Sequence, residues 1–489
     1  MELINEFLKN TKVTRKQLES YTKHPIMEKK YPKRHMYVLL RKYAEDFFKA
    51  GTEPRFIGIV GLRGVGKTTL MWQIAEYIYN NITKNMYFFN VNTITAINSN
   101  IIKIMQDFQN HILKARFSEY NEPIVLLFDE VHDDPNWAKA MKILYDEART
   151  AFILCTGSSA LLINQTPDIA RRIKTERLYP LSFTEFVTAK SFYANEERLL
   201  PEKGISLELE NALFYSQTIE EAKKRIEDIK PRISDYLSKV SKVFSKNGKE
   251  ENHIYIYVDD YLKFYNIPYF ILYKDKFRIY EEVQTLFTRI IHEDVGRLSD
   301  TEINAEQMLK LLIRIAGSDE INIDSISQNY GINKKEIENI ISVLEKSEVL
   351  NVLNPYGGID SKLTKNKKAF FMSPTLRMAL LYSIYKMDIP EQFVDKIYED
   401  IVVLYVRRRV QNGFLSYVTT SSEKTPDFVL ETRDRPILLE VGKGKRTAKQ
   451  IYRSEIKDYR YGILISKAFD DVYFSENTVK LPLSWFLLI

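Results

Sequence analysis

The chain has 489 residues, a hydrophobic fraction of 45% and a formal net charge of +6. This length exceeds what one hydrophobic core serves, so we expect about three or four domains. The composition excludes an integral membrane protein, because no apolar run reaches the roughly 18 to 20 residues that span a bilayer. The single cysteine, Cys155, excludes an intrachain disulfide, and acidic Glu2 and Glu6 argue against a secretory signal. A cytoplasmic protein is therefore expected, and its positive charge permits a polyanionic partner.

Residues 1–50 are predicted to form an N-terminal helical segment that contains a basic loop. The basic residues surround Pro32 and are Lys29, Lys30, Lys33 and Arg34. A largely apolar run follows from Met36 to Phe48. Charge runs of this kind are usually solvated, so we expect a loop and a helix that lead into the next domain.

From residue 51 the sequence alternates between apolar runs and helical stretches. The predicted strands are Phe56–Val60, Met86–Val91, Ile124–Phe128 and Phe152–Cys155. Strands separated by helices are typical of a parallel sheet with covering helices. We therefore expect an α/β core over residues 51–190, followed by a charged helical lid over residues 191–290.

A phosphate-binding motif follows the first of these strands. Residues 61–68 read GLRGVGKT, which has the P-loop spacing, and Thr69–Tyr79 reads as a helix. Lys67 would neutralise the β and γ phosphates of ATP, and the hydroxyl of Thr68 would bind Mg²⁺. The residues expected to surround the nucleotide are Gly61, Leu62, Arg63, Gly64, Val65, Gly66, Lys67, Thr68 and Thr69.

Further polar groups follow two later strands of the same sheet. The stretch IVLLFDE at 124–130 ends in Asp129, expected in the Mg²⁺ shell, and Glu130, expected to orient or deprotonate the attacking water. Ser158 lies in FILCTGSS at 152–159, where its hydroxyl would bond that water or the γ phosphate, or would cap a helix. These residues together predict Mg²⁺-dependent ATP hydrolysis.

Residues 291–385 have the outline of a winged helix-turn-helix. Helical patterns at Glu306–Ala316, Asp324–Asn329 and Lys334–Lys346 precede strands at Val349–Leu353 and Lys368–Met372. The third helix carries acids beside its lysines, so reading of DNA bases and packing against the ATPase are both open. The better phosphate contacts lie in the wing and are Lys362, Lys365, Lys367 and Lys368.

Residues 386–489 are predicted to form a separate α/β domain. Glu399 lies on a predicted helix, Asp427 opens a strand, and Glu440 lies on the next strand. This arrangement resembles a metal-dependent nuclease of the PD-(D/E)XK type, which implies that the three acids hold Mg²⁺. Such nucleases carry a lysine two residues after the glutamate, where this chain has Gly442. Lys443 is then the lysine candidate, if a bulge turns it inward.

A run of polar and basic residues follows the proposed nuclease site. At helical spacing it would form a stripe that suits a DNA or RNA backbone. A solvated helix face is the alternative. The residues of this run are Arg446, Lys449, Gln450, Arg453, Lys457 and Arg460.

Several motifs together resemble one family, the archaeal AAA+/STAND-type P-loop ATPases with a winged helix and a nuclease-like tail. These motifs are GLRGVGKT, LLFDE, TGSSA at 156–160 and YPLSFTEF at 179–186. The resemblance implies that Arg172 stabilises the transferring γ-phosphoryl group, in which case a contact across a subunit boundary would require a homo-oligomer. A surface ion pair is the alternative role for Arg172.

The sequence thus predicts an α/β protein that binds ATP and Mg²⁺ and acts on nucleic acid. DNA is the expected partner, and no association with a membrane is expected. In the first hypothesis it is an ATP-gated DNA-processing enzyme with a working nuclease. In the second it is a regulatory switch whose tail only binds. A protein-interaction scaffold without nucleic-acid contact ranks last.

Overall fold

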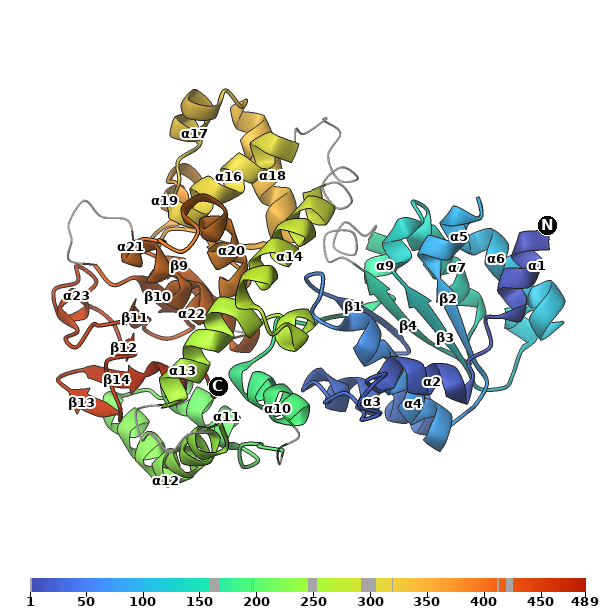
Figure 1. Ribbon diagram of the computed structural model, residues 1–489, viewed down its shortest axis with the longest axis horizontal. Helices are drawn as coiled ribbons and strands as arrows, with labels where there is room; N and C mark the ends of the chain where they lie inside the picture. The colour runs from blue at the N-terminus through green and yellow to red at the C-terminus, as the bar shows by residue number, and fades with distance from the viewer. Residues whose placement is uncertain are drawn as a thin grey trace. The chain divides into compact units, whose positions relative to one another are not determined.

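The computed structural model describes residues 2–157, 167–194, 196, 198–244, 253–291, 305–318, 320–410, 413–418 and 425–489 (Figure 1). Its internal contacts divide the chain into two compact units, Met1–Tyr179 and Pro180–Ile489. Within the described ranges, none of the helices combines the length and the apolar character that a membrane span requires.

A five-stranded parallel sheet forms the centre of the first unit. Its strands are β1 (Phe56–Val60), β2 (Met86–Asn90), β3 (Ile124–Asp129), β4 (Ala151–Gly157) and β5 (Lys174–Arg177). They pair in the order β2-β3-β4-β1-β5. The four predicted strands are confirmed. They could be recognised from the sequence because strands that helices cover on both faces read as largely continuous apolar runs. The edge strand β5, with the sequence KTER, is partly exposed and has no such run.

Helices cover both faces of this sheet (Figure 1). One face carries α2 (Arg15–Thr22), α3 (Met36–Ala50) and α4 (Lys67–Asn81). The other carries α1 (Glu2–Lys9), α5 (Val91–Ala96), α6 (Ile101–Phe108), α7 (Trp137–Glu147) and α9 (Pro167–Ala170). The unit also contains the short π-helix η1 (Gln109–Leu113) and the 3-10 helices η2 (Phe117–Glu119) and η3 (Val131–Asp133). Aromatic rings fill this second layer, where Phe89 stacks on Phe128 at 5.0 Å and meets Phe108 edge-on at 5.4 Å. The α/β class is therefore confirmed for the first unit.

The second unit begins with a helical region. It contains α10 (Phe183–Ala194), α11 (Ile205–Glu210), η4 (Asn211–Tyr215), α12 (Ile219–Phe244), α13 (His253–Asp260), η5 (Tyr261–Tyr265), η6 (Pro268–Leu272) and α14 (Lys276–Arg289). The polar break expected at 245–252 lies outside the described residues. Tyr261 is fully buried, and its hydroxyl donates to the carbonyl of Leu181 at 2.7 Å.

Three helices and a small antiparallel sheet follow. They are α16 (Ala305–Gly317), β6 (Glu320–Ile321), α17 (Ile323–Tyr330), α18 (Lys334–Lys346), β7 (Leu350–Leu353), α19 (Ile359–Thr364), β8 (Lys367–Phe371) and α20 (Pro374–Tyr385). The strands pair in the order β6-β8-β7. The predicted apolar face of α18 is buried, including Ile337, Ile340 and Leu344. A short helix, α19, occupies the segment where only a polar loop was expected.

The chain ends in a six-stranded mixed sheet with the order β13-β14-β12-β11-β10-β9. Its elements are α21 (Glu391–Val394), α22 (Lys396–Arg409), β9 (Phe414–Tyr417), β10 (Phe428–Glu431), β11 (Ile437–Gly442), α23 (Lys449–Tyr452), β12 (Gly462–Ser466), β13 (Tyr473–Ser475), β14 (Thr478–Pro482) and α24 (Leu483–Phe486). β10 runs antiparallel to β11, whereas β12 is parallel to it. The start of β10 therefore lies beside the end of β11.

A fully buried ion pair joins the small antiparallel sheet region to the six-stranded sheet region. The Arg377 guanidinium on α20 donates to both carboxylate oxygens of Asp400 on α22, at 2.6 and 2.8 Å, and neither side chain is exposed. Arg377 also donates to the carbonyl of Ala316 at 2.8 Å, and Asp400 accepts from the amide of Phe371 at 2.8 Å. Four elements thus meet at one pair of charges.

Candidate functional site

The P-loop connects β1 to α4 and depends on glycine at several positions. Gly61, Gly64 and Gly66 have φ angles of +152°, +84° and +92°, a region that other residues rarely adopt. A side chain at Gly61 would also place its Cβ 2.3 Å from the carbonyl oxygen of Leu178. The loop therefore closes tightly before α4 begins at Lys67, which leaves the first amides of this helix available for an anion.

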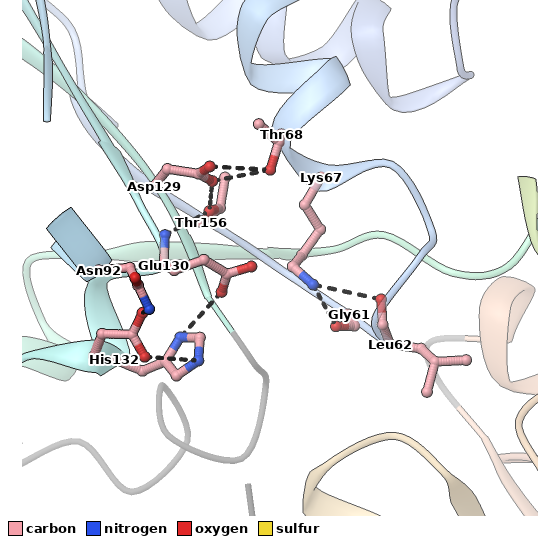
Figure 2. A network of polar contacts seen from close by, with 10 residues as sticks. Gly61, Leu62, Lys67, Thr68, Asn92, Asp129, Glu130, His132 and Thr156 are labelled. Carbon is pink, nitrogen blue, oxygen red and sulfur yellow. Dashed lines mark hydrogen bonds and ion pairs between the residues drawn. The ribbon is translucent and has the colours of Figure 1, made fainter. Parts of the chain in front are cut away.

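Lys67 extends back over the loop (Figure 2). Its side chain is buried, and its Nζ donates to the carbonyls of Gly61 at 3.0 Å and Leu62 at 3.4 Å. The ammonium is therefore held inside the loop, where phosphate oxygens would replace these carbonyls as its partners.

Thr68, Asp129 and Thr156 form a hydrogen-bonded cluster across three elements (Figure 2). The Thr68 hydroxyl lies 3.0 Å from Asp129 Oδ1, and the Thr156 hydroxyl donates to the same oxygen at 2.5 Å. Burial, followed by the charge of Glu130, raises the pKa of Asp129, while the hydroxyls and Lys67 oppose this shift. The hydroxyl of Thr68 and the carboxylate of Asp129 are hard oxygen donors, so they fit Mg²⁺.

Glu130 lies immediately after β3 in a left-handed conformation, with φ of +55°. Its amide donates to the Thr156 hydroxyl at 3.0 Å, and its Oε2 lies 3.3 Å from Nδ1 of His132. His132 is buried. The carboxylate thus lies at the carboxyl end of β3 with an imidazole as its neighbour (Figure 2).

The role of Thr156 was not predicted from the sequence, although its strand was. We expect Thr156→Val to lower the kcat of ATP hydrolysis by about 10- to 100-fold, because a hydrogen bond to a charged group contributes roughly 1.5–3 kcal/mol. Steady-state phosphate release would measure this effect. Thr175→Val on β5, the edge strand of the same sheet, is the matched control, and equal losses in both variants would contradict a specific role for Thr156.

Arg34 differs from the rest of the basic cluster around Pro32. Its guanidinium donates to the carbonyls of Val65 and Tyr179, both at 2.7 Å. Lys29, Lys30 and Lys33 are exposed, as expected for a solvated charge run. The interpretation as a solvated loop is therefore wrong for Arg34, which fastens the N-terminal segment to the P-loop.

Two other predicted residues of the ATPase site have different outcomes. Ser158 lies outside the described residues. Arg172 follows α9 and makes a bidentate ion pair with Asp146, with N–O distances of 2.8 and 3.1 Å. This contact favours the surface ion pair as its role, and action across a subunit boundary stays a prediction.

A second polar centre lies at the adjoining ends of β10 and β11. Asp427 Oδ2 accepts from the amide of Val441 at 2.7 Å, which fixes this carboxylate beside the strand that carries Glu440. Lys445 Nζ lies 3.1 Å from Asp427 Oδ2 and 3.5 Å from Glu440 Oε1. Gln450 accepts from the same ammonium at 3.0 Å. One lysine therefore bridges the two predicted acids.

The charges in this second centre influence one another. Burial, with a smaller effect of Asp427, raises the pKa of Glu440 to about 7, while Lys445 acts in the opposite direction. Burial lowers the pKa of Lys445, but Asp427, Glu440 and Glu399 outweigh it, so this pKa is raised. Among the described residues, however, there is no group of three or more acids, histidines or cysteines placed to hold a metal. Glu399 thus influences the charge of Lys445, but within the described residues it does not complete a three-acid metal site with Asp427 and Glu440.

The predicted lysine and the predicted basic stripe both differ from the structure. Lys443 pairs with Glu391 and not with the two acids. The helix α23 ends at Tyr452, so the stripe is not continuous. Arg460 is buried and donates to the carbonyls of Arg435, Ser216 and Phe214. Its role is structural, whereas the exposed residues of the run are Arg446, Lys449, Arg453 and Lys457.

The wing lysines also differ among themselves. Lys362 makes an ion pair with Glu431 at 3.1 Å, and Lys368 lies over the ring of Tyr417, 5.0 Å from its centroid. Both therefore have protein partners within the second unit. Lys365 and Lys367 are exposed.

Two segments of the chain match models of known protein families. Residues 53–187 match the family model described as "AAA domain", and residues 268–384 match a domain of unknown function, DUF8612. The first match supports an AAA-type P-loop ATPase domain, a class that binds nucleotide and typically Mg²⁺. The P-loop, Asp129 and Glu130 all fall within it.

Two relatives come from Methanocaldococcus jannaschii. Uncharacterized protein MJ1637 is 28% identical and covers 96% of this chain and 93% of its own length. Uncharacterized protein MJ1544 is 24% identical over 86% of this chain and 83% of its own length. Among solved structures, the Aeropyrum pernix Orc1 protein in complex with DNA aligns at 12% identity, over 71% of this chain and 92% of that one, with a TM-score of 0.32. That score carries no functional argument.

Proposed function

We propose that this protein hydrolyses ATP with Mg²⁺ and couples its nucleotide state to a DNA-binding second unit. The observation that supports this most directly is the contact between Thr68 and Asp129, at 3.0 Å, beside the buried ammonium of Lys67. It joins the P-loop helix to the acidic end of β3, as a shared Mg²⁺ site requires.

The proposed reaction assigns one role to each group. The loop amides and Lys67 bind the β and γ phosphates, and Thr68 and Asp129 hold the metal. Mg²⁺, when bound, would neutralise charge on the phosphate oxygens. Glu130 would take a proton from the water that attacks the γ phosphorus, and the bond to the ADP oxygen would break. Arg172, and Ser158 beyond the described residues, are proposed as further contacts to the γ phosphate.

We further propose that residues 291–385 form a winged helix and that residues 386–489 form a nuclease-like domain. The order of α16, α17 and α18 followed by β7 and β8 supports the first assignment. The placement of Asp427 and Glu440 at adjoining strand ends supports the second. With these two domains, the function that we propose for the whole chain is that of a DNA-processing ATPase.

A regulatory switch is the second candidate function. In that case the tail would hold DNA without cutting it. Gly442, which stands where the nuclease lysine is expected, favours this candidate. Both candidates require the same ATPase and the same affinity for a polyanion.

DNA binding can be tested through its dependence on salt. We expect replacement of Arg446, Lys449 and Arg453 by alanine to weaken binding and to flatten the plot of log K against log [salt], since each lost phosphate contact changes the slope by about 0.9. Fluorescence anisotropy with a labelled duplex would measure both quantities. Replacing the exposed Lys29, Lys30 and Lys33 by alanine is the charge-matched control. Binding that ignores salt in the wild type would favour the protein-interaction scaffold.

A further inference from the structure

Gly442 creates a space beside the acidic pair of the tail. It lies two residues after Glu440 on β11, so a side chain at 442 would point to the same face of the sheet. A Cβ built at this position would lie 2.7 Å from Cγ and 2.8 Å from Cδ of Lys445. The side chain of Lys445 therefore passes through the space that a residue at 442 would occupy.

The ammonium of Lys445 lies beside the acidic pair, where a nuclease of the PD-(D/E)XK type would place the ammonium of a lysine at position 442. It lies 3.1 Å from Asp427 and 3.5 Å from Glu440, and Gln450 holds it at 3.0 Å. The turn after β11 thus returns the side chain to the acidic pair. Lys443, by contrast, is bound to Glu391.

A second observation indicates that this centre takes a cationic ligand. Glu440 is 2% exposed, and within the described ranges its Oε2 has no hydrogen-bond partner. A buried carboxylate oxygen is costly to leave unpaired, so it is available for a further cation. The oxygen donors of Asp427 and Glu440 fit Mg²⁺ or Mn²⁺.

We infer that Lys445, seated over Gly442, supplies the catalytic lysine of a phosphodiesterase centre that also contains Asp427 and Glu440. The inference rests on the nuclease-like domain proposed above and assigns that domain cleavage as well as binding. Its substrate class is a nucleic-acid phosphodiester.

The reaction needs only water besides the substrate. A water oxygen forms a bond to phosphorus, and the bond from phosphorus to one ester oxygen breaks. One water proton is released to solvent, and the departing oxygen takes up a proton. Lys445 would orient the water and stabilise the negative charge that builds up on the phosphate. A bound divalent cation would supply further charge stabilisation.

Cleavage of supercoiled plasmid and of single-stranded DNA by the full chain, with Mg²⁺ or Mn²⁺, tests the inference. We expect Lys445→Ala to slow cleavage by about 10²- to 10³-fold, the usual effect of losing one group that stabilises transition-state charge. Lys443→Ala is the matched control and should cleave like the wild type. In the double variant Gly442→Lys/Lys445→Ala, the new lysine has the vacated space, and cleavage should recover well above that of Lys445→Ala.

Mn²⁺ binding, followed by electron paramagnetic resonance without nucleotide, separates catalysis from folding. Asp427→Asn should lose one bound Mn²⁺ that Lys445→Ala retains. The inference would be overturned if Lys445→Ala cleaved DNA at the wild-type rate. It would also be overturned if the wild type bound this Mn²⁺ but cleaved neither substrate. ATP turnover in the same samples tests the proposed ATPase separately, because its absence in the wild type would contradict that function and leave the cleavage result standing.

Discussion

ATP turnover is expected to fall by about 10²- to 10³-fold or more when Lys67 is replaced by alanine, since a single preorganised charge at the reacting phosphates has at least this effect. The buried Nζ of Lys67 lies within the P-loop, bound to the carbonyls of Gly61 and Leu62. The side chains that bond Asp129 beside it are the hydroxyls of Thr68 and Thr156, which cannot replace a positive charge. Steady-state phosphate release with Mg²⁺ would measure the loss.

Two controls separate this loss from misfolding. Lys84→Ala removes an exposed lysine from the same unit and should leave turnover unchanged. Thermal unfolding of Lys67→Ala should show a folded protein, and its DNA binding without nucleotide should persist. Hydrolysis that survives in Lys67→Ala would remove the basis of the nucleotide assignment, including the roles given to Thr68 and Asp129.

The sequence predicted those parts of the fold whose signal is local. The strands β1, β3 and β4 are buried along their whole length, so their sequences are nearly continuous apolar runs. The helices α16, α17 and α18 also follow their patterns closely. Missed elements lacked such a signal, as in β6, which has only two residues, and the polar helix α19.

The same distinction applies to the candidate site. GLRGVGKT and the two acids at the end of β3 are contiguous motifs with a strand and a helix beside them, so their positions follow from spacing. Thr156 and Arg34 reach the site through tertiary packing. Lys445 is the clearest case, because its approach to Asp427 depends on the turn after β11 and on the missing side chain at Gly442.

The buried pair of Arg377 and Asp400 should dominate the stability of the second unit. We expect Asp400→Ala to lower its free energy of unfolding by about 3–5 kcal/mol, the usual cost of leaving a buried charge without its partner. Both side chains have no exposed surface, and Asp400 also accepts from the amide of Phe371. Denaturant unfolding, with hydrogen exchange to locate the change, would measure this effect.

A surface ion pair provides the contrast for this prediction. Lys239 and Asp235 lie 2.6 Å apart on α12 with side chains 60% and 62% exposed, so Lys239→Ala should cost about 0.5 kcal/mol or less. Increased hydrogen exchange in Asp400→Ala should centre on α16, α20, α22 and β8, because these elements meet at the pair. If Asp400→Ala were as stable as the surface variant, water or rearranged side chains would have to solvate Arg377. The region before residue 386 and the tail after it would then depend on their other contacts, such as the ion pair of Lys362 with Glu431.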